Sequence, residues 1–133
     1  MKLMHYVTCV ALGLCLVSCS GGNERKRAET VAGDCVKAMA ADNSEALRNL
    51  MTAQMYTNYV SARDQLQKSA ALLATFGQKI PDLSKIELMS TSCERTDGDR
   101  AYVDVETRIG EKSQFEKMVM KKVGGNWKVA GKQ

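Results

Sequence analysis

Apolar residues recur at helical spacing in the first part of the chain, and three stripes result. The first consists of Ala28, Val31, Ala32, Cys35, Val36, Met39 and Ala40. It predicts a helix over about residues 24–41. The second consists of Ala46, Leu47, Leu50 and Met51. It predicts a brief helix, for which Asp42 and Glu45 have the spacing of a capping box. The third consists of Met55, Tyr59, Ala62, Leu66, Ala70 and Leu73. It predicts a long amphipathic helix that Gly77 ends and Pro81 prevents from resuming.

Beyond Pro81 the pattern changes from helical to alternating. Residues 85–95 and 101–109 form two apolar-alternating runs separated by the turn dipeptide Asp97-Gly98, and residues 115–123 and 127–129 follow after glycine-containing turns. Alternation of this kind is typical of strands with one buried and one wet face. Phe115 is out of phase with Met118 and Met120, which predicts a bulge in the third strand. The expected fold class is α+β, with three N-terminal helices packed on a curved four-stranded antiparallel sheet.

The N-terminus carries a separate signal. Lys2 precedes an apolar stretch over residues 7–17 that is too short to span a bilayer, and the stretch ends in Leu16-Val17-Ser18-Cys19. This segment resembles the lipobox of bacterial lipoproteins. The resemblance implies that residues 1–18 are a signal peptide, that Cys19 receives the lipid anchor with its palmitate-type acyl chains, and that residues 19–23 are a tether to a single domain, 24–133. The alternative is an ordinary signal peptide with a chance cysteine.

Ser20, rather than an aspartate, follows the candidate lipidation site. By resemblance to the sorting rule of enteric lipoproteins, this implies a cell-envelope location, on the outer membrane and facing the periplasm. Lipidation of Cys19 would leave Cys35 and Cys93 as the remaining thiols of the mature chain. Because the envelope is oxidising, we expect an intrachain disulfide between them. The alternative is two buried free cysteines that act as small apolar residues.

The composition of the chain argues against several kinds of catalysis, metal binding and partner. The only histidine is His5, so a mature chain that begins at Cys19 contains none, which argues against histidine-based catalysis and zinc ligation. No cofactor or metal site is expected. An aromatic content of 5% and the expected location outside the cytoplasm argue against nucleic acid as a partner.

Two groups of charged residues could belong either to a functional site or to the solvated surface. Asp104 and Glu106 share one face of a strand, but Val103 and Val105 alternate with them, so we expect both acids in solvent and no catalytic role. Basic residues gather in Glu24-Arg25-Lys26-Arg27 and in the segment from Arg108 to Gln133. The first cluster suits either anionic headgroups of a nearby membrane or a solvated helix end, and we favour the solvated helix end. The second suits either an acidic partner or a solvated surface that deters edge-to-edge strand pairing, and we favour the solvated surface.

A family resemblance rests on two stretches. Residues 28–50, with Ala28-Glu29-Thr30-Val31 and Ala46-Leu47-Arg48-Asn49-Leu50, and the terminal Gly125-Asn126-Trp127-Lys128-Val129 are similar to small lipoproteins of the nuclear transport factor 2-like superfamily, many of which are cystatin-like domains of unknown function. The resemblance implies a cone-shaped cavity between helices and sheet. We therefore expect a non-enzymatic module that binds a small apolar ligand or a protein partner. The alternatives are a carboxylate-dependent isomerase or lyase, and an inhibitor or immunity-type protein that acts by surface contact.

Overall fold

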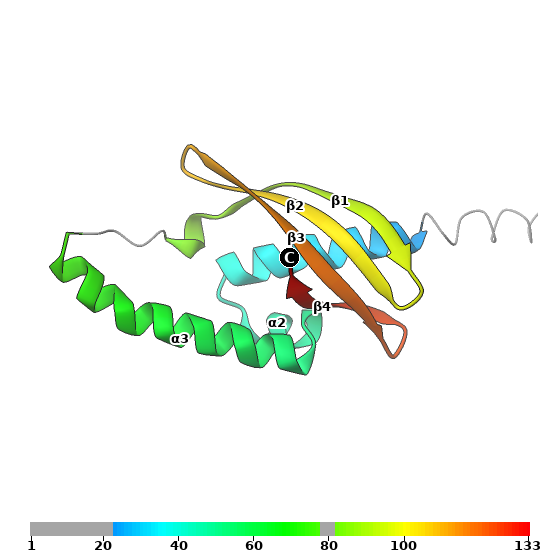
Figure 1. The fold of residues 1–133 in the computed structure, drawn as a ribbon, viewed down its shortest axis with the longest axis horizontal. Helices are drawn as coiled ribbons and strands as arrows, with labels where there is room; N and C mark the ends of the chain where they lie inside the picture. The colour runs from blue at the N-terminus through cyan, green and yellow to red at the C-terminus, as the bar shows by residue number, and fades with distance from the viewer. Residues whose placement is uncertain (1–22, 78–81) are drawn as a thin grey trace, which may run out of the picture.

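A computed structural model describes residues 23–77 and 82–133. Residues 23–40 form the N-terminal helix, and the elements that follow are α2 (Ser44–Leu50), α3 (Ala53–Thr75), the short 3-10 helix η1 (Leu83–Lys85), β1 (Glu87–Asp97), β2 (Arg100–Ile109), β3 (Lys112–Val123) and β4 (Asn126–Lys132). All four strands form one antiparallel sheet in the order β1-β2-β3-β4 (Figure 1). The predicted α+β class, with three helices before a four-stranded meander, is confirmed.

The strand register explains the sidedness of the sheet. Val103 lies opposite Met118 and Ala101 opposite Met120, and all four side chains are buried on the inner face. Phe115, which pairs with Glu106, belongs to the other face and is 78% exposed. The β2–β3 ladder runs without a shift, so the bulge predicted at Phe115 was wrong: this side chain simply points outward. The irregularities lie instead in β1 and between Val119 and Met120 of the β3–β4 ladder.

The N-terminal helix packs on the inner face of the sheet through the stripe that the sequence predicted. Ala28, Ala32, Cys35 and Val36 are all buried there. Gly33 leaves room for the Leu88 side chain of β1 against the helix, since a Cβ at this position would lie 3.0 Å from Cδ2 of Leu88.

The connection into α2 differs from the predicted cap. Asn43, not Asp42, is the N-cap residue, and its side-chain oxygen accepts a hydrogen bond from the Ala46 amide at 3.2 Å. Asp42 has a φ of 55°, the left-handed region, and its carboxylate pairs instead with the Arg63 guanidinium of α3 (2.8 Å from Nη2 to Oδ2). Both residue types cap helices well, so only the backbone turn decides between them.

Helix α3 is the long helix that the third stripe predicted, but it is not a core helix. It contains no fully buried residue, although Met55 and Tyr59 pack against the core from its first turns. Leu72 and Phe76 are 64% and 74% exposed, and Figure 1 shows the later turns (green) extending away from the rest of the fold. The beginning of α3 is held to the sheet because the Thr52 amide donates to the Val129 carbonyl of β4 at 2.9 Å.

Candidate ligand-binding cavity

A cavity of about 520 Å³ lies between the N-terminal helix, the start of α3 and the inner face of β2 to β4. Its lining is mainly apolar. The apolar side chains in the lining are Cys35, Val36, Met39, Met51, Met55, Ala62, Leu83, Ile86, Ile109, Met118, Val129 and Ala130. Small-molecule sites in proteins typically enclose about 300–1,000 Å³. This space is therefore large enough for a small apolar ligand.

Four methionines give the cavity an adaptable wall. Met39, Met51, Met55 and Met118 come from four different segments, and Met51 and Met118 are almost completely buried. An unbranched thioether side chain has three rotatable bonds and adjusts to irregular shapes. Met118 faces the cavity, whereas Met120, two residues along the same strand, is buried in the core outside the cavity lining.

A few polar groups interrupt the apolar lining: Asn58, Tyr59, Thr107, Gln114, Glu116 and Lys132. Lys132 Nζ lies 3.0 Å from Oε2 of Glu116, so the two charges neutralise one another at the cavity wall. Burial raises the pKa of the Tyr59 hydroxyl above its ordinary value of 10.0, which keeps this group protonated and able to donate a hydrogen bond.

Glu116 is the cavity carboxylate that sequence reasoning missed. The available signal was the β3 alternation itself, in which Glu116 shares the phase of Met118 and Met120. The acids that the sequence did single out lie elsewhere. Asp104 is exposed on the outer face, 3.9 Å from the Lys117 ammonium, and Glu106 accepts a hydrogen bond from the Ser90 hydroxyl at 3.2 Å. Their predicted position on the solvated face is confirmed.

Both cysteines that the structure describes are buried free thiols, so the expected disulfide between Cys35 and Cys93 is absent and that prediction is corrected. The reason is the position of the two cysteines along the axis of the N-terminal helix. The Cys93 amide donates to Oε1 of Glu29 at 2.8 Å, which places this part of β1 beside the earlier turns of the helix. Cys35 lies six residues, or about 9 Å, further along the helix axis and lines the cavity. Burial raises the pKa of its thiol to about 11.

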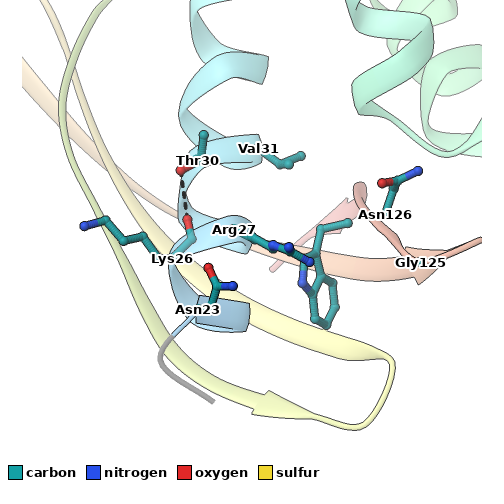
Figure 2. A pocket seen from close by; sticks show the side chains of 8 residues that line it. Asn23, Lys26, Arg27, Thr30, Val31, Gly125 and Asn126 are labelled. Atoms are coloured by element: carbon teal, nitrogen blue, oxygen red, sulfur yellow. Dashed lines mark hydrogen bonds between the residues drawn. The ribbon is translucent and has the colours of Figure 1, made fainter. Parts of the chain in front are cut away.

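A second hollow of about 430 Å³ lies at the opposite end of the N-terminal helix. It is lined by Asn23, Lys26, Arg27, Thr30, Val31, Gly125, Asn126 and Trp127. Figure 2 shows Arg27 projecting toward the β3/β4 turn at Gly125 and Asn126, whereas Lys26 leaves the helix on another side. This hollow is more polar than the first cavity, and no sequence pattern predicted that these two segments meet.

Several sequence predictions fall outside the described residues. Cys19, the candidate lipidation site, and the predicted signal peptide of residues 1–18 belong to this part of the chain. Within residues 23–77 and 82–133, no helix has the length and apolar content to cross a bilayer, and no group of three or more acidic, cysteine or histidine side chains is arranged to hold a metal ion.

Comparison with protein-family models and with curated proteins found no match to this chain.

Proposed function

We propose that this protein is a lipid-anchored module of the cell envelope that binds a small apolar or amphiphilic ligand without chemical turnover. The observation that carries the proposal is the methionine-rich cavity, which combines apolar walls with a small number of polar groups. That combination is typical of sites that bury the apolar body of a ligand and orient its polar end. The nuclear transport factor 2-like resemblance supports the same reading, because it implies a cavity between helices and sheet.

The position of the polar groups suggests how such a ligand is oriented. Thr107 and Gln114 lie near the β2/β3 turn, opposite each other in the ladder, and Glu116 and Lys132 lie on the neighbouring strands. The cysteine and methionine side chains line the part of the cavity nearer the centre of the fold. A ligand with an apolar tail and a hydrogen-bonding head therefore fits with its head toward the β2/β3 turn.

Glu116 bears on the isomerase or lyase alternative, since it is the one carboxylate among the cavity-lining residues. A general base must reach the proton it abstracts and must not be held by a stronger partner. Glu116 is partly exposed and paired with Lys132, so its arrangement favours a structural role at the cavity margin over proton transfer.

Binding is tested with a neutral fluorescent apolar probe, N-phenyl-1-naphthylamine, and a variant that fills the cavity. Ala62 lines the cavity from α3, so Ala62→Trp places an indole in the ligand space. Ala71→Trp is the matched control, because it makes the same change on an exposed face of the same helix, away from the cavity. We expect probe affinity to fall at least about tenfold in Ala62→Trp and to stay unchanged in Ala71→Trp. Equal affinities in both variants would contradict a ligand site in this cavity.

The anchor is tested separately by Cys19→Ala. The wild-type protein should incorporate labelled palmitate. It should also fractionate with membranes, because one acyl chain holds a protein only reversibly and two or three hold it firmly. The variant should do neither. Continued incorporation of palmitate by the variant would contradict lipidation at Cys19 and would leave the cavity proposal intact.

A further inference from the structure

Three segments that are distant in sequence meet at one end of the domain. Glu24, in the first described turn of the N-terminal helix, accepts hydrogen bonds from Lys122 Nζ at 2.9 Å and from Trp127 Nε1 at 2.8 Å, on either side of the β3/β4 turn. The Lys122 amide in turn donates to the Asp99 carbonyl of the β1/β2 turn at 2.7 Å. The start of the helix and the two hairpin turns therefore form a single end, which Figure 1 shows beside the point where the described chain begins.

This end, called the basic end below, holds the excess positive charge of the chain. Its basic side chains are Arg25, Lys26, Arg27, Arg100, Lys121, Lys122 and Lys128, and its acidic ones are Glu24, Asp97 and Asp99. The difference equals the net charge of +4 of the whole sequence, so the remaining residues balance one another. The Glu24 carboxylate is already engaged by Lys122, by Trp127 and by Arg27, whose guanidinium lies 3.6 Å from Oε1. These contacts, chiefly the hydrogen bond from Lys122, lower the pKa of Glu24 and leave the remaining cations of this end without its charge.

The outer face of the sheet adds a row of like charges at the same end. Arg100 lies opposite Lys121 in the β2–β3 ladder, and Lys121 lies opposite Lys128 in the β3–β4 ladder. Like charges directly opposite each other destabilise a sheet. Within the described part of the chain, none of the three has an acidic side chain within 4.0 Å, although four of the seven basic residues from Arg108 onward do. In the β1–β2 ladder Asp97 lies opposite Arg100, whereas Lys121 and Lys128 lie opposite basic residues only. Two lysines that cost stability and have no acidic residue opposite them are expected where an external anion supplies the compensation.

The polar hollow lies at this end as well. Lys26 and Arg27 contribute cationic groups, and Asn23, Thr30 and Asn126 contribute amide and hydroxyl groups. Figure 2 shows these side chains around the first turns of the helix. A phosphate-bearing headgroup needs this mixture of charged and neutral donors.

We propose that the basic end is a docking face for anionic lipid headgroups of the membrane in which Cys19 is anchored. The proposal rests on the proposed anchor for its geometry. Asn23 is the fourth residue after Cys19, and a fully extended chain spans at most about 3.6 Å per residue, so the helix starts within about 14 Å of the anchor. Electrostatic attraction reaches about 8–10 Å at physiological salt. The basic end therefore stays within or near the range of the headgroup charges, whereas the apolar cavity faces away.

The test measures protection of lysines from acetylation in the full protein. The protein is mixed or reconstituted with vesicles of phosphatidylcholine alone or of equimolar phosphatidylcholine and phosphatidylglycerol, and each lysine is followed by mass spectrometry. We expect Lys121 and Lys128 to react at least about fivefold more slowly on the anionic vesicles, because each basic residue near such a surface gains about a factor of five in local binding. Lys68, exposed on α3, should react equally on both vesicles. Protection should disappear in concentrated salt, where the screening length falls to about 3 Å.

A charge-reversal variant separates docking from folding. Lys121→Glu places an acid between Arg100 and Lys128, which should preserve or strengthen the sheet while weakening protection of Lys128. Lys68→Glu is the control with the same change in net charge, and it should leave protection of Lys128 intact.

Equal acetylation on both kinds of vesicle would overturn the docking face. Protection by polyglutamate but not by anionic vesicles would also overturn it, because the face would then be a site for an acidic protein. Retention of the protein on neutral vesicles reports the anchor alone, so failure of the anchor and failure of the docking face are distinguishable.

Discussion

The Cys35 thiol offers a sharp test of the apolar character of the cavity. Its side chain is fully buried in the cavity wall, and burial raises its pKa from an ordinary value of 9.0 to about 11. A group whose pKa is higher in the folded state than in the unfolded state stabilises the fold. This contribution to the free energy of unfolding is fully present below the unfolded pKa and is lost as the pH rises through the folded pKa. We therefore expect the free energy of unfolding to fall between about pH 9 and pH 11, and Cys35→Ala should remove this contribution.

The magnitude follows from the shift. Each pKa unit corresponds to about 1.4 kcal/mol, so a shift of two units contributes about 3 kcal/mol in total and about 1 kcal/mol by pH 10. Removal of the buried sulfur in Cys35→Ala should cost about 1 kcal/mol at pH 8. The stability difference between the two proteins should consequently shrink as the pH rises and approach zero near pH 10.

The assay is urea unfolding at pH 8, 9 and 10, followed by the fluorescence of Trp127, the only tryptophan in the sequence. The pKa of Cys93 is also raised, chiefly by burial, and therefore acts with the same sign in both proteins. Cys35→Ala isolates the contribution of the cavity thiol for this reason. A stability difference that stays constant from pH 8 to pH 10 would refute the reasoning, because it would mean that Cys35 is solvated or has no free thiol to titrate.

Two further predictions concern the ends of helices. Lys122 lowers the pKa of Glu24 below its ordinary 4.5, so the contribution of this carboxylate is present above pH 4.5 and is lost as the pH falls through the lowered value. Trp127 emission should change over that acid range, and Glu24→Gln should abolish the change; an unaltered acid transition in the variant would contradict the assignment. Asn43→Ala should lower the free energy of unfolding by about 1 kcal/mol through loss of the α2 cap, measured by urea unfolding, with an effect below about 0.5 kcal/mol arguing against Asn43 as the cap.

Hydrophobic periodicity was sufficient to predict the elements of this fold. The stripe through Ala28, Ala32 and Val36 identified the face of the N-terminal helix that packs on the sheet, and the alternation from Ala101 to Ile109 identified β2 and its buried side. Both patterns are local, because the spacing of apolar residues that identifies a helix or strand also shows which of its faces is buried. Turn glycines then separated the strands, and Gly98 and Gly124 indeed have positive φ angles.

The candidate sites depended on information that no local pattern contains. Phe115 gave β3 the wrong apparent phase, which concealed the inward direction of Glu116. We predicted the disulfide because the elements that carry the two cysteines were expected to pack together. Cys35, however, lies further along the helix axis, where it lines the cavity, whereas Cys93 lies beside Glu29. The cavity arises because only the first turns of α3 pack against the core. Which turns pack there depends on tertiary contacts and not on helix propensity.

The pairing of Asp42 with Arg63 divides α3 into two parts of unequal local stability. The residues of α3 that line the cavity end at Ala62, immediately before Arg63, and beyond this point Leu66 and Leu72 are exposed and no residue is buried. Helical turns without buried apolar contacts open with a free energy near zero, whereas turns that share the core open only with it. Fraying that starts at Thr75 should therefore run back along the helix and stop at Arg63. The cavity wall, whose α3 residues Met55 and Tyr59 pack against the core, is therefore separated from the motion of the turns that follow Arg63.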